Sequence, residues 1–123
     1  MMKAYVDFIK KCGVFFVNTV SDNAPESRPF GVISYDGAYL YIATAKGKKV
    51  YNEMKANPNI QITAILNGTR EWVRISGLAY EDNSFEKKIF MFTDNPRLSN
   101  IYESVHDPVF TIFRVEVTNL EKY

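Results

Sequence analysis

The order of hydrophobic and polar residues along the chain predicts six β-strands. Segments rich in aromatic and β-branched side chains alternate with turn residues such as Gly, Asn and Asp, which is typical of strands and hairpins. The predicted strands cover residues 14–20, 30–35, 39–44, 59–66, 71–81 and 109–117. Along 71–81, side chains alternate between a face with Trp72 and Arg74 and a face with Val73 and Ile75. The pattern therefore predicts a mainly β fold.

Apolar residues three or four positions apart predict short helices between some of the strands. These helices cover residues 1–11, 48–56, 82–92 and 98–103. Gly13 is expected to end the first helix, and Asn95-Pro96 separates the last two. The side chains expected to face inward are Tyr5 or Val6 with Ile9, then Val50 with Met54, then Phe85, Ile89 and Phe92.

Turn residues predict how the strands are connected. Asp36-Gly37 predicts a two-residue hairpin turn that places Tyr35 opposite Ala38 and, counting outward, Arg28 opposite Ala45. The segment Ser21 to Pro25 is expected to be a loop in which Asn23 adopts a left-handed conformation. Gly77, in the middle of a strand, indicates a bulge of the kind that closes a small barrel. Together these features predict a small antiparallel barrel.

Basic residues gather at the start of the second predicted helix. The expected hairpin brings Arg28 beside Lys46-Gly47-Lys48-Lys49, immediately before that helix. A helix N-terminus offers unpaired N–H groups and the positive end of the helix dipole. Arg28, Lys48 and Lys49 therefore predict a phosphate site, whereas the alternative interpretation of this charge run is a solvated loop.

Composition restricts the functional classes. The 123 residues predict one domain, and 15 basic against 14 acidic residues give a net charge of +1, which argues against nucleic-acid and membrane-surface binding. The single Cys12 fits a reducing, cytoplasmic setting. No apolar segment approaches the ~18 residues of a membrane span. The absence of Cys/His clusters argues against a metal site.

The order of motifs resembles a known family. R-P-F-G, D-G, Y-I-A-T, K-G-K-K, N-G and W-V-R-I-S-G follow one another as in the pyridoxamine 5′-phosphate oxidase-like FMN-binding split-barrel family. The resemblance implies a six-stranded antiparallel split β-barrel spanning residues 1–123. It also implies a homodimer that binds FMN between its subunits and acts on a small molecule.

The resemblance also implies roles for individual residues. Arg28 opens the flavin-contacting strand, and Pro29, Phe30 and Gly31 run along the isoalloxazine ring. Ile42, Ala43 and Thr44 belong to the neighbouring strand, whose backbone meets the flavin. Lys48 and Lys49 bind the phosphate, and Trp72 occupies the position of a residue that reaches the flavin from the second subunit. Gly47 replaces a phosphate-binding serine, and the first hairpin lacks the family's common glycine, which argues against pyridoxamine phosphate as the substrate.

Three functional hypotheses follow. The first is an FMN-dependent oxidoreductase with an unidentified substrate and unidentified catalytic residues, since flavin chemistry needs no nucleophile–base pair. The second is a non-enzymatic flavin carrier or electron-transfer module. The third is a split barrel that binds another anionic cofactor, such as a deazaflavin or haem. Trp72 is alternatively a packing residue, Arg74 an interface ion pair or a substrate ligand, and His106 a loop residue.

Overall fold

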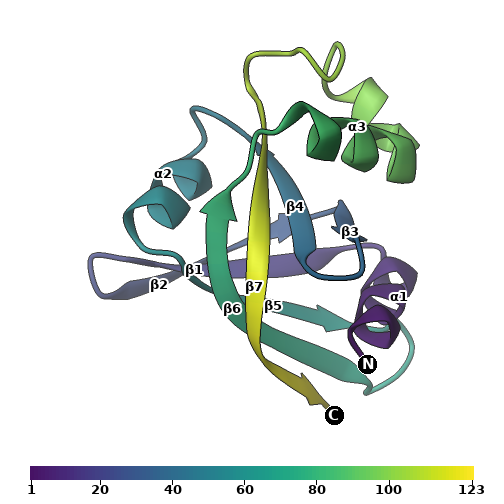
Figure 1. Cartoon of the computed structure of the whole chain (residues 1–123). Helices are drawn as coiled ribbons and strands as arrows, with labels where there is room; N and C mark the ends of the chain where they lie inside the picture. Colours follow the sequence, from purple (N-terminus) through teal and green to yellow (C-terminus); the bar gives the residue numbers. More distant parts are fainter.

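A computed structural model describes residues 1–123, and its centre is a seven-stranded antiparallel sheet that curls into a half-barrel (Figure 1). The strands lie in the order β2-β1-β5-β6-β7-β4-β3, so β2 and β3 form the two edges. Their bounds are β1 Phe15–Ser21, β2 Ala24–Phe30, β3 Ile33–Tyr35, β4 Leu40–Ala45, β5 Asn59–Ile65, β6 Trp72–Glu81 and β7 Phe110–Lys122. The predicted mainly β split barrel is confirmed, with seven strands in place of six.

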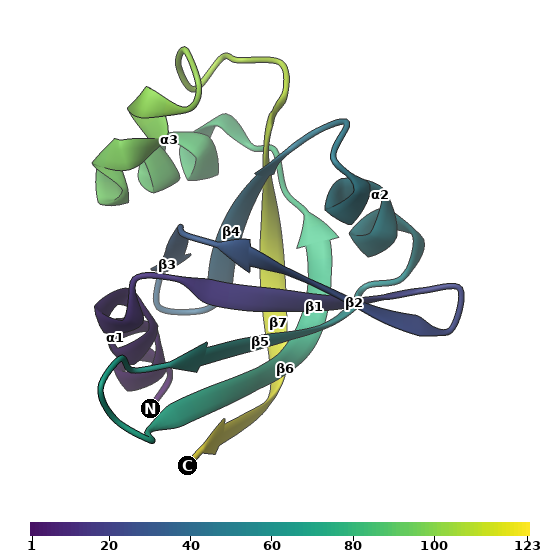
Figure 2. The ribbon, with the colours of Figure 1, turned by 180° about the vertical axis from the view of Figure 1, so that it is seen from behind.

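Three α-helices and one 3₁₀-helix pack around this sheet. They are α1 Met2–Cys12, α2 Lys49–Ala56, α3 Phe85–Asp94 and the 3₁₀-helix η1 Pro96–Asn100. Figures 1 and 2 show α1 and α2 on opposite sides of the half-barrel, whereas α3 lies beyond the ends of β4 and β6. The helices therefore pack against different parts of the half-barrel.

Two apolar clusters hold the elements together. The larger cluster fills the half-barrel and includes Val6 and Ile9 of α1 and Val50 and Met54 of α2. These pairs confirm the inward faces predicted for the first two helices. The smaller cluster joins the outer side of β4 and β7 to α3 and η1, and it contains Tyr41, Met91, Leu98, Phe110 and Ile112. Strand β4 and the first residues of β7 are thus buried on both faces, which explains why apolar side chains occur there on both faces of the strand.

The predicted register of the Asp36-Gly37 hairpin is wrong. Tyr35 pairs with Leu40 instead of Ala38, because Asp36 Oδ1 accepts hydrogen bonds from the backbone N–H groups of Ala38 and Tyr39 and widens the turn. Gly31 and the residue after it leave the sheet, so the single predicted strand becomes β2 and β3 at opposite edges. Arg28 consequently pairs with Val17 of β1 and not with Ala45.

Strands β1 and β2 form a hairpin whose turn is shorter than predicted. Asp22 and Asn23 both have positive φ, which confirms the left-handed conformation expected at Asn23. Ala24 and Pro25 already belong to β2, where Ser21 pairs with Ala24. Proline is tolerated here because β2 is an edge strand whose outer side needs no backbone donor.

The bulge predicted at Gly77 is confirmed. The pairing of β6 with β7 shifts between Ser76 and Gly77, where Ser76 lies opposite Asn119 and Gly77 opposite Val117. A Cβ atom on Gly77 would lie only 2.7 Å from the backbone oxygen of Glu116. The two strands therefore lie so close together that a side chain at position 77 would not fit between them. The predicted alternation of β6 is also confirmed, since Val73 and Ile75 are buried whereas Trp72 and Arg74 are half-buried.

The predictions around α3 are partly wrong. The helix begins at Phe85 instead of residue 82, and η1 spans Pro96–Asn100 instead of residues 98–103. Phe85 and Ile89 are 53% and 43% exposed, so they do not face inward. Met91 is the buried residue of the helix, with Phe90 and Phe92 partly buried beside it. Phe92 therefore packs on the smaller apolar cluster as predicted, and Lys87 donates a hydrogen bond to Asp36.

Candidate functional site

A pocket with three basic side chains lies between β2, β4, α2 and η1. We call it the basic pocket; it has a volume of about 170 Å³, and half of its twelve lining residues are hydrophobic. The residues that line it are Arg28, Pro29, Phe30, Gly31, Val32, Ala43, Thr44, Lys48, Val50, Arg97, Leu98 and Ile101. None is acidic, so the lining combines positive charge with apolar surface.

The local sequence explains how each wall forms. Gly47, with φ of 96°, turns the chain between β4 and α2 in a conformation that favours glycine, and Lys48 then caps the helix. Across the pocket, Pro96 begins η1 and directs Arg97 back over Gly31. Arg97 Nη1 donates a hydrogen bond to the Gly31 carbonyl at 3.2 Å. A Cβ atom on Gly31 would lie 3.1 Å from Arg97 Nη2, so the absence of a side chain at Gly31 allows this close approach.

Arg28 is held in place by a buried hydrogen-bond network. Its Nη1 donates to the Val17 carbonyl at 3.0 Å and to Thr19 Oγ1 at 2.8 Å, and its Nη2 donates to Glu53 Oε1 at 2.5 Å. Thr19 Oγ1 in turn donates to the same oxygen of Glu53 at 2.7 Å. The Nε–H and one N–H of Nη2 make no hydrogen bond within the chain and remain available to a ligand.

The two lysines differ in their partners. Lys49 forms ion pairs with Glu26 and, at 3.7 Å, with Glu53 Oε2. The hydrogen bond with Glu26 raises the pKa of Lys49 and lowers the pKa of Glu26. The ion pairs of this region thus use Arg28 and Lys49, which leaves Lys48 without an acidic partner. Lys48 is therefore the most available cation on this wall.

The residues present fit an anionic group such as a phosphate. The pocket offers two spare N–H donors of Arg28, an unpaired Lys48 and the guanidinium of Arg97, with no carboxylate in its lining. An adjoining hollow shares Arg28, Lys48 and Val50 and adds Lys49 and Glu26. A ligand bound at Lys48 would thus meet Arg28 and Arg97 in the pocket and the ion pair of Lys49 with Glu26 in the adjoining hollow.

The structure brings most of the predicted site residues together. Arg28, Pro29, Phe30, Gly31, Ala43, Thr44 and Lys48 line the basic pocket, and Lys49 lines the adjoining hollow. Arg28 lies near Lys48 because the curled sheet brings β2 close to α2, and not because it pairs with β4. The side chain of Ile42 is fully buried in the larger apolar cluster and does not line the pocket.

Trp72 lies far from the basic pocket of its own chain. It pairs with Tyr123 at the end of β7, whereas Thr44 pairs with Thr111 near the start of that strand. The rings of Trp72 and Tyr123 stack with centroids 4.6 Å apart. Arg74 lies over the Trp72 ring and forms an ion pair with Glu121 at 2.7 Å. Within one chain Trp72 is therefore a packing residue.

Sequence analysis did not identify Arg97 and Glu53 as members of this region. Arg97 lies far from Arg28 along the sequence. The only sequence feature that marks Arg97 is the preceding Pro96, which begins η1. Glu53 lies between the apolar Val50 and Met54 in the sequence of α2, yet it is buried. Its burial depends on Arg28, which the sequence alone does not place beside it. His106 is an exposed loop residue, as predicted, and stacks on Phe85.

Comparison with solved structures supports the same architecture. A NimC/NimA family protein from Clostridium acetobutylicum is 30% identical, with 99% of this chain and 90% of that chain covered and a TM-score of 0.87. A candidate 5-nitroimidazole antibiotic resistance protein from Bacteroides thetaiotaomicron is 16% identical over 99% and 82%, with a TM-score of 0.79. An FAD-binding protein from Mesorhizobium loti is 19% identical over 99% and 93%, with a TM-score of 0.71. The last two likenesses show the fold alone.

The fold and the basic pocket define a split β-barrel protein with a cleft suited to an anion. The sequence model of a family described as pyridoxamine 5′-phosphate oxidase matches residues 1–122. The chain therefore belongs to the pyridoxamine 5′-phosphate oxidase family, which confirms the resemblance in the sequence motifs. Comparison with curated protein sequences finds no match. None of the helices in the structure has the length and apolar character needed to cross a membrane.

Proposed function

We propose that this protein binds FMN in the basic pocket and acts as a flavin-dependent oxidoreductase. The observation that carries the proposal is the pocket lining, which combines three cations, six hydrophobic residues and no carboxylate. Such a lining suits a ligand with one anionic end and one large apolar ring system. Family membership and the FAD-binding neighbour from Mesorhizobium loti support a flavin.

The chain's own residues would bind and orient the cofactor. Lys48 and the spare N–H groups of Arg28 would hold the phosphate, because charge-assisted hydrogen bonds are the strong ones. The walls of Phe30, Val50 and Ile101 would cover the apolar part of the ring system and exclude water from it. FMN, when bound, supplies the hydride or electron transfer, so the protein needs no acid–base pair of its own.

The proposed state is a homodimer with FMN between the subunits. The basic pocket of about 170 Å³ is smaller than the roughly 300–1,000 Å³ of typical ligand sites, so a cofactor of this size would extend beyond it. The outer face of the sheet also leaves large side chains exposed, among them Phe16, Ile65 and Tyr80. A second chain would cover such side chains, and its Trp72 would contact the cofactor of the first chain.

The experiment begins with the absorption spectrum of the purified protein and a fluorescence titration of apoprotein with FMN and riboflavin. FMN should bind more tightly than riboflavin, because riboflavin lacks the phosphate. Anaerobic addition of NADH or NADPH to the loaded protein should then bleach the flavin. Equal affinity for both ligands would contradict the phosphate site. Loaded protein that no reductant bleaches would indicate a flavin carrier instead of an oxidoreductase.

A further inference from the structure

Glu53 is a buried carboxylate whose hydrogen bonds are incomplete. Its side chain is 5% exposed; Oε1 accepts from Arg28 and Thr19, whereas Oε2 is buried without a hydrogen-bond partner. The Lys49 ammonium lies 3.7 Å from Oε2. Burying a carboxylate is costly unless a counter-charge compensates it. The position of Glu53 thus depends on the cations of the proposed phosphate site.

Arg28 separates Glu53 from the basic pocket. Arg28 lines the pocket, whereas Glu53 lines a different hollow, between α2 and the turn that contains Asp22. Glu53 therefore does not contact a ligand in the pocket directly. Glu53 acts through Arg28. It compensates the positive charge of Arg28, and together with Thr19 it fixes the orientation of the guanidinium.

We propose that Glu53 is a built-in counter-anion that balances Arg28 in the free protein and lowers the affinity of the basic pocket for phosphate. The inference rests on the proposed function in assigning a phosphate group to this pocket. Without Glu53, the Arg28 side chain, which is only 21% exposed, would lack a counter-charge, and an incoming phosphate would supply it. With Glu53 present, the chain folds without a ligand and binds phosphate reversibly. Glu53 is thus a positioning residue that sets cofactor affinity.

The test uses the variant Glu53→Gln, which keeps the side-chain oxygen that Arg28 and Thr19 contact but removes the charge. Removal of one negative charge a few ångströms behind Arg28 should raise affinity for FMN and for pyrophosphate by about 10- to 100-fold. Without ligand, the variant should unfold at a lower temperature than the wild type. Its melting temperature should then rise more steeply with added inorganic phosphate. Fluorescence titration and thermal unfolding measure these two effects.

Two controls separate this effect from a general change in charge or stability. Glu71→Gln removes the same charge from an exposed position at the distant end of β6, and it should leave both measurements unchanged. The double variant Arg28→Gln/Glu53→Gln should show no gain over Arg28→Gln alone, because Glu53 acts through Arg28. A gain that persists without Arg28 would contradict the proposal.

Unchanged or weaker binding of FMN and pyrophosphate in Glu53→Gln would overturn the inference. If Glu53→Gln folds only with phosphate, the inference is supported; if it never folds, Glu53→Ala, which also removes the charge, replaces it and should likewise gain affinity. No gain in Glu53→Ala would then overturn the proposal. Failure of the proposed function looks different: the wild type would bind no flavin, while phosphate would still stabilise Glu53→Gln more than the wild type. If neither protein responds to any anion, both proposals fail.

Discussion

Lys48 lines the pocket and carries neither an intrachain ion pair nor a side-chain hydrogen bond, so its charge is fully available to a ligand. Lys48→Ala should weaken FMN binding about 10- to 100-fold, since a hydrogen bond to a charged group contributes roughly 1.5–3 kcal/mol. Riboflavin affinity should change little, because the lost contact is to the phosphate. Fluorescence titration of apoprotein with both ligands measures the two affinities.

Lys46 provides the matched control for this variant. It lies two positions earlier on the same loop, is exposed and does not line the pocket. Lys46→Ala should therefore bind FMN as the wild type does. Lys49→Ala should have a smaller effect than Lys48→Ala, because Lys49 is already paired with Glu26 and Glu53. An equal loss of FMN and riboflavin affinity in Lys48→Ala would contradict a phosphate contact.

At the residue scale, the sequence indicates the chemistry of a side chain but not its partner. The lysines after Gly47 were recognisable because they precede a helix, and Arg28 because it opens a motif. Neither signal shows that Glu53 accepts a hydrogen bond from the Arg28 guanidinium, since that contact joins β2 to α2 across the curled sheet. Arg97 was missed for the same reason, because only the fold brings η1 over Gly31.

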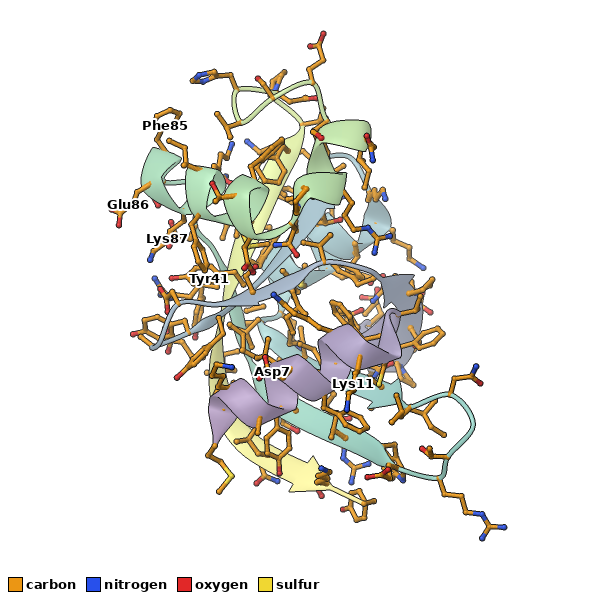
Figure 3. The ribbon with its side chains drawn as sticks, turned by 90° about the vertical axis from the view of Figure 1, so that its right-hand side faces the viewer. Asp7, Lys11, Tyr41, Phe85, Glu86 and Lys87 are labelled. Atoms are coloured by element: carbon orange, nitrogen blue, oxygen red, sulfur yellow. The ribbon has the colours of Figure 1, made fainter.

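A small cluster of polar side chains links helix α3 to the β3–β4 turn. Lys87 forms an ion pair with Asp36 at 2.8 Å, and the hydroxyl of Tyr41 donates to the same oxygen at 2.9 Å. Figure 3 shows Lys87 and Tyr41 close together at the sheet side of α3, with Phe85 projecting from its first turn. Burial and the hydrogen bond to Asp36 raise the pKa of Tyr41 to about 12, so it remains protonated.

Asp36→Asn should destabilise the protein by about 1–3 kcal/mol at pH 7. Burial disfavours the charged form of Asp36, but hydrogen bonds from Lys87, Tyr39, Ala38 and Tyr41 outweigh it and hold its pKa well below the usual range. A carboxylate with a lowered folded-state pKa stabilises fully above its unfolded pKa of ~3.9 and loses this contribution as pH falls below it. The difference from wild type should therefore be constant from pH 7 to about 4 and shrink at lower pH.

Urea unfolding at several pH values measures this difference in the free energy of unfolding. Asp7→Asn is the control, because Asp7 lies on the exposed side of α1 and pairs only with Lys3 (Figure 3). That variant should change stability by less than about 0.5 kcal/mol. A wild-type advantage over Asp36→Asn that grows as the pH falls below 4 would contradict the assigned role of Asp36.

The bulge in β6 gives a second prediction at the scale of the element. Gly77→Ala should destabilise the barrel by about 1–3 kcal/mol or more, because the new Cβ would lie 2.7 Å from the Glu116 backbone oxygen and 2.9 Å from Val115. The neighbouring Ser76→Ala keeps the backbone free of this contact and should cost less. Thermal unfolding compares the two variants. If they unfold at the same temperature, the close approach at Gly77 does not constrain the strands.

At the element scale, periodicity predicted the strands and the first two helices correctly because one face of each is buried. It failed where a segment has little apolar pattern or more than one apolar face. Strand β2 is mostly exposed, contains two prolines and has little apolar pattern, so the sequence predicts a loop over part of it. In α3 the run of Ile89 to Phe92 offers two apolar faces. The structure packs Phe90, Met91 and Phe92 on the smaller apolar cluster and leaves Ile89 exposed, a choice that the apolar pattern alone does not make.

For the whole molecule, the order of motifs was sufficient to predict the split barrel. It was not sufficient to predict which strands pair, because a turn residue specifies its own hairpin and not the position of that hairpin in the sheet. The notable case is R-P-F-G, which was placed beside β4 but pairs with β1. The basic pocket still forms, since the curl of the sheet brings Arg28 close to α2 by another route. Trp72 lies away from the basic pocket of its own chain, so it would contact a bound cofactor only in an assembly of two chains.

The proposed homodimer predicts complementation between two defective chains. In a dimer where each cofactor meets Lys48 of one chain and Trp72 of the other, Lys48→Ala and Trp72→Ala homodimers should both bind FMN weakly. A mixed dimer of the two variants should contain one doubly defective site and one intact site. Differently tagged chains, purified as the mixed dimer, should therefore bind about half the wild-type amount of FMN with wild-type affinity. Sedimentation of the mixture verifies the dimer before the titration.

The control is a mixed dimer of two differently tagged Lys48→Ala chains, which should recover no high-affinity site. Recovery in the Lys48→Ala/Trp72→Ala dimer cannot come from one chain alone, because the basic pocket and Trp72 lie at opposite ends of β7. If Trp72→Ala homodimers bind FMN as tightly as the wild type, Trp72 has only its packing role against Tyr123. If the protein sediments as a monomer with FMN bound, each chain builds its site alone, and the adjoining hollow beside Lys49 must hold the rest of the cofactor.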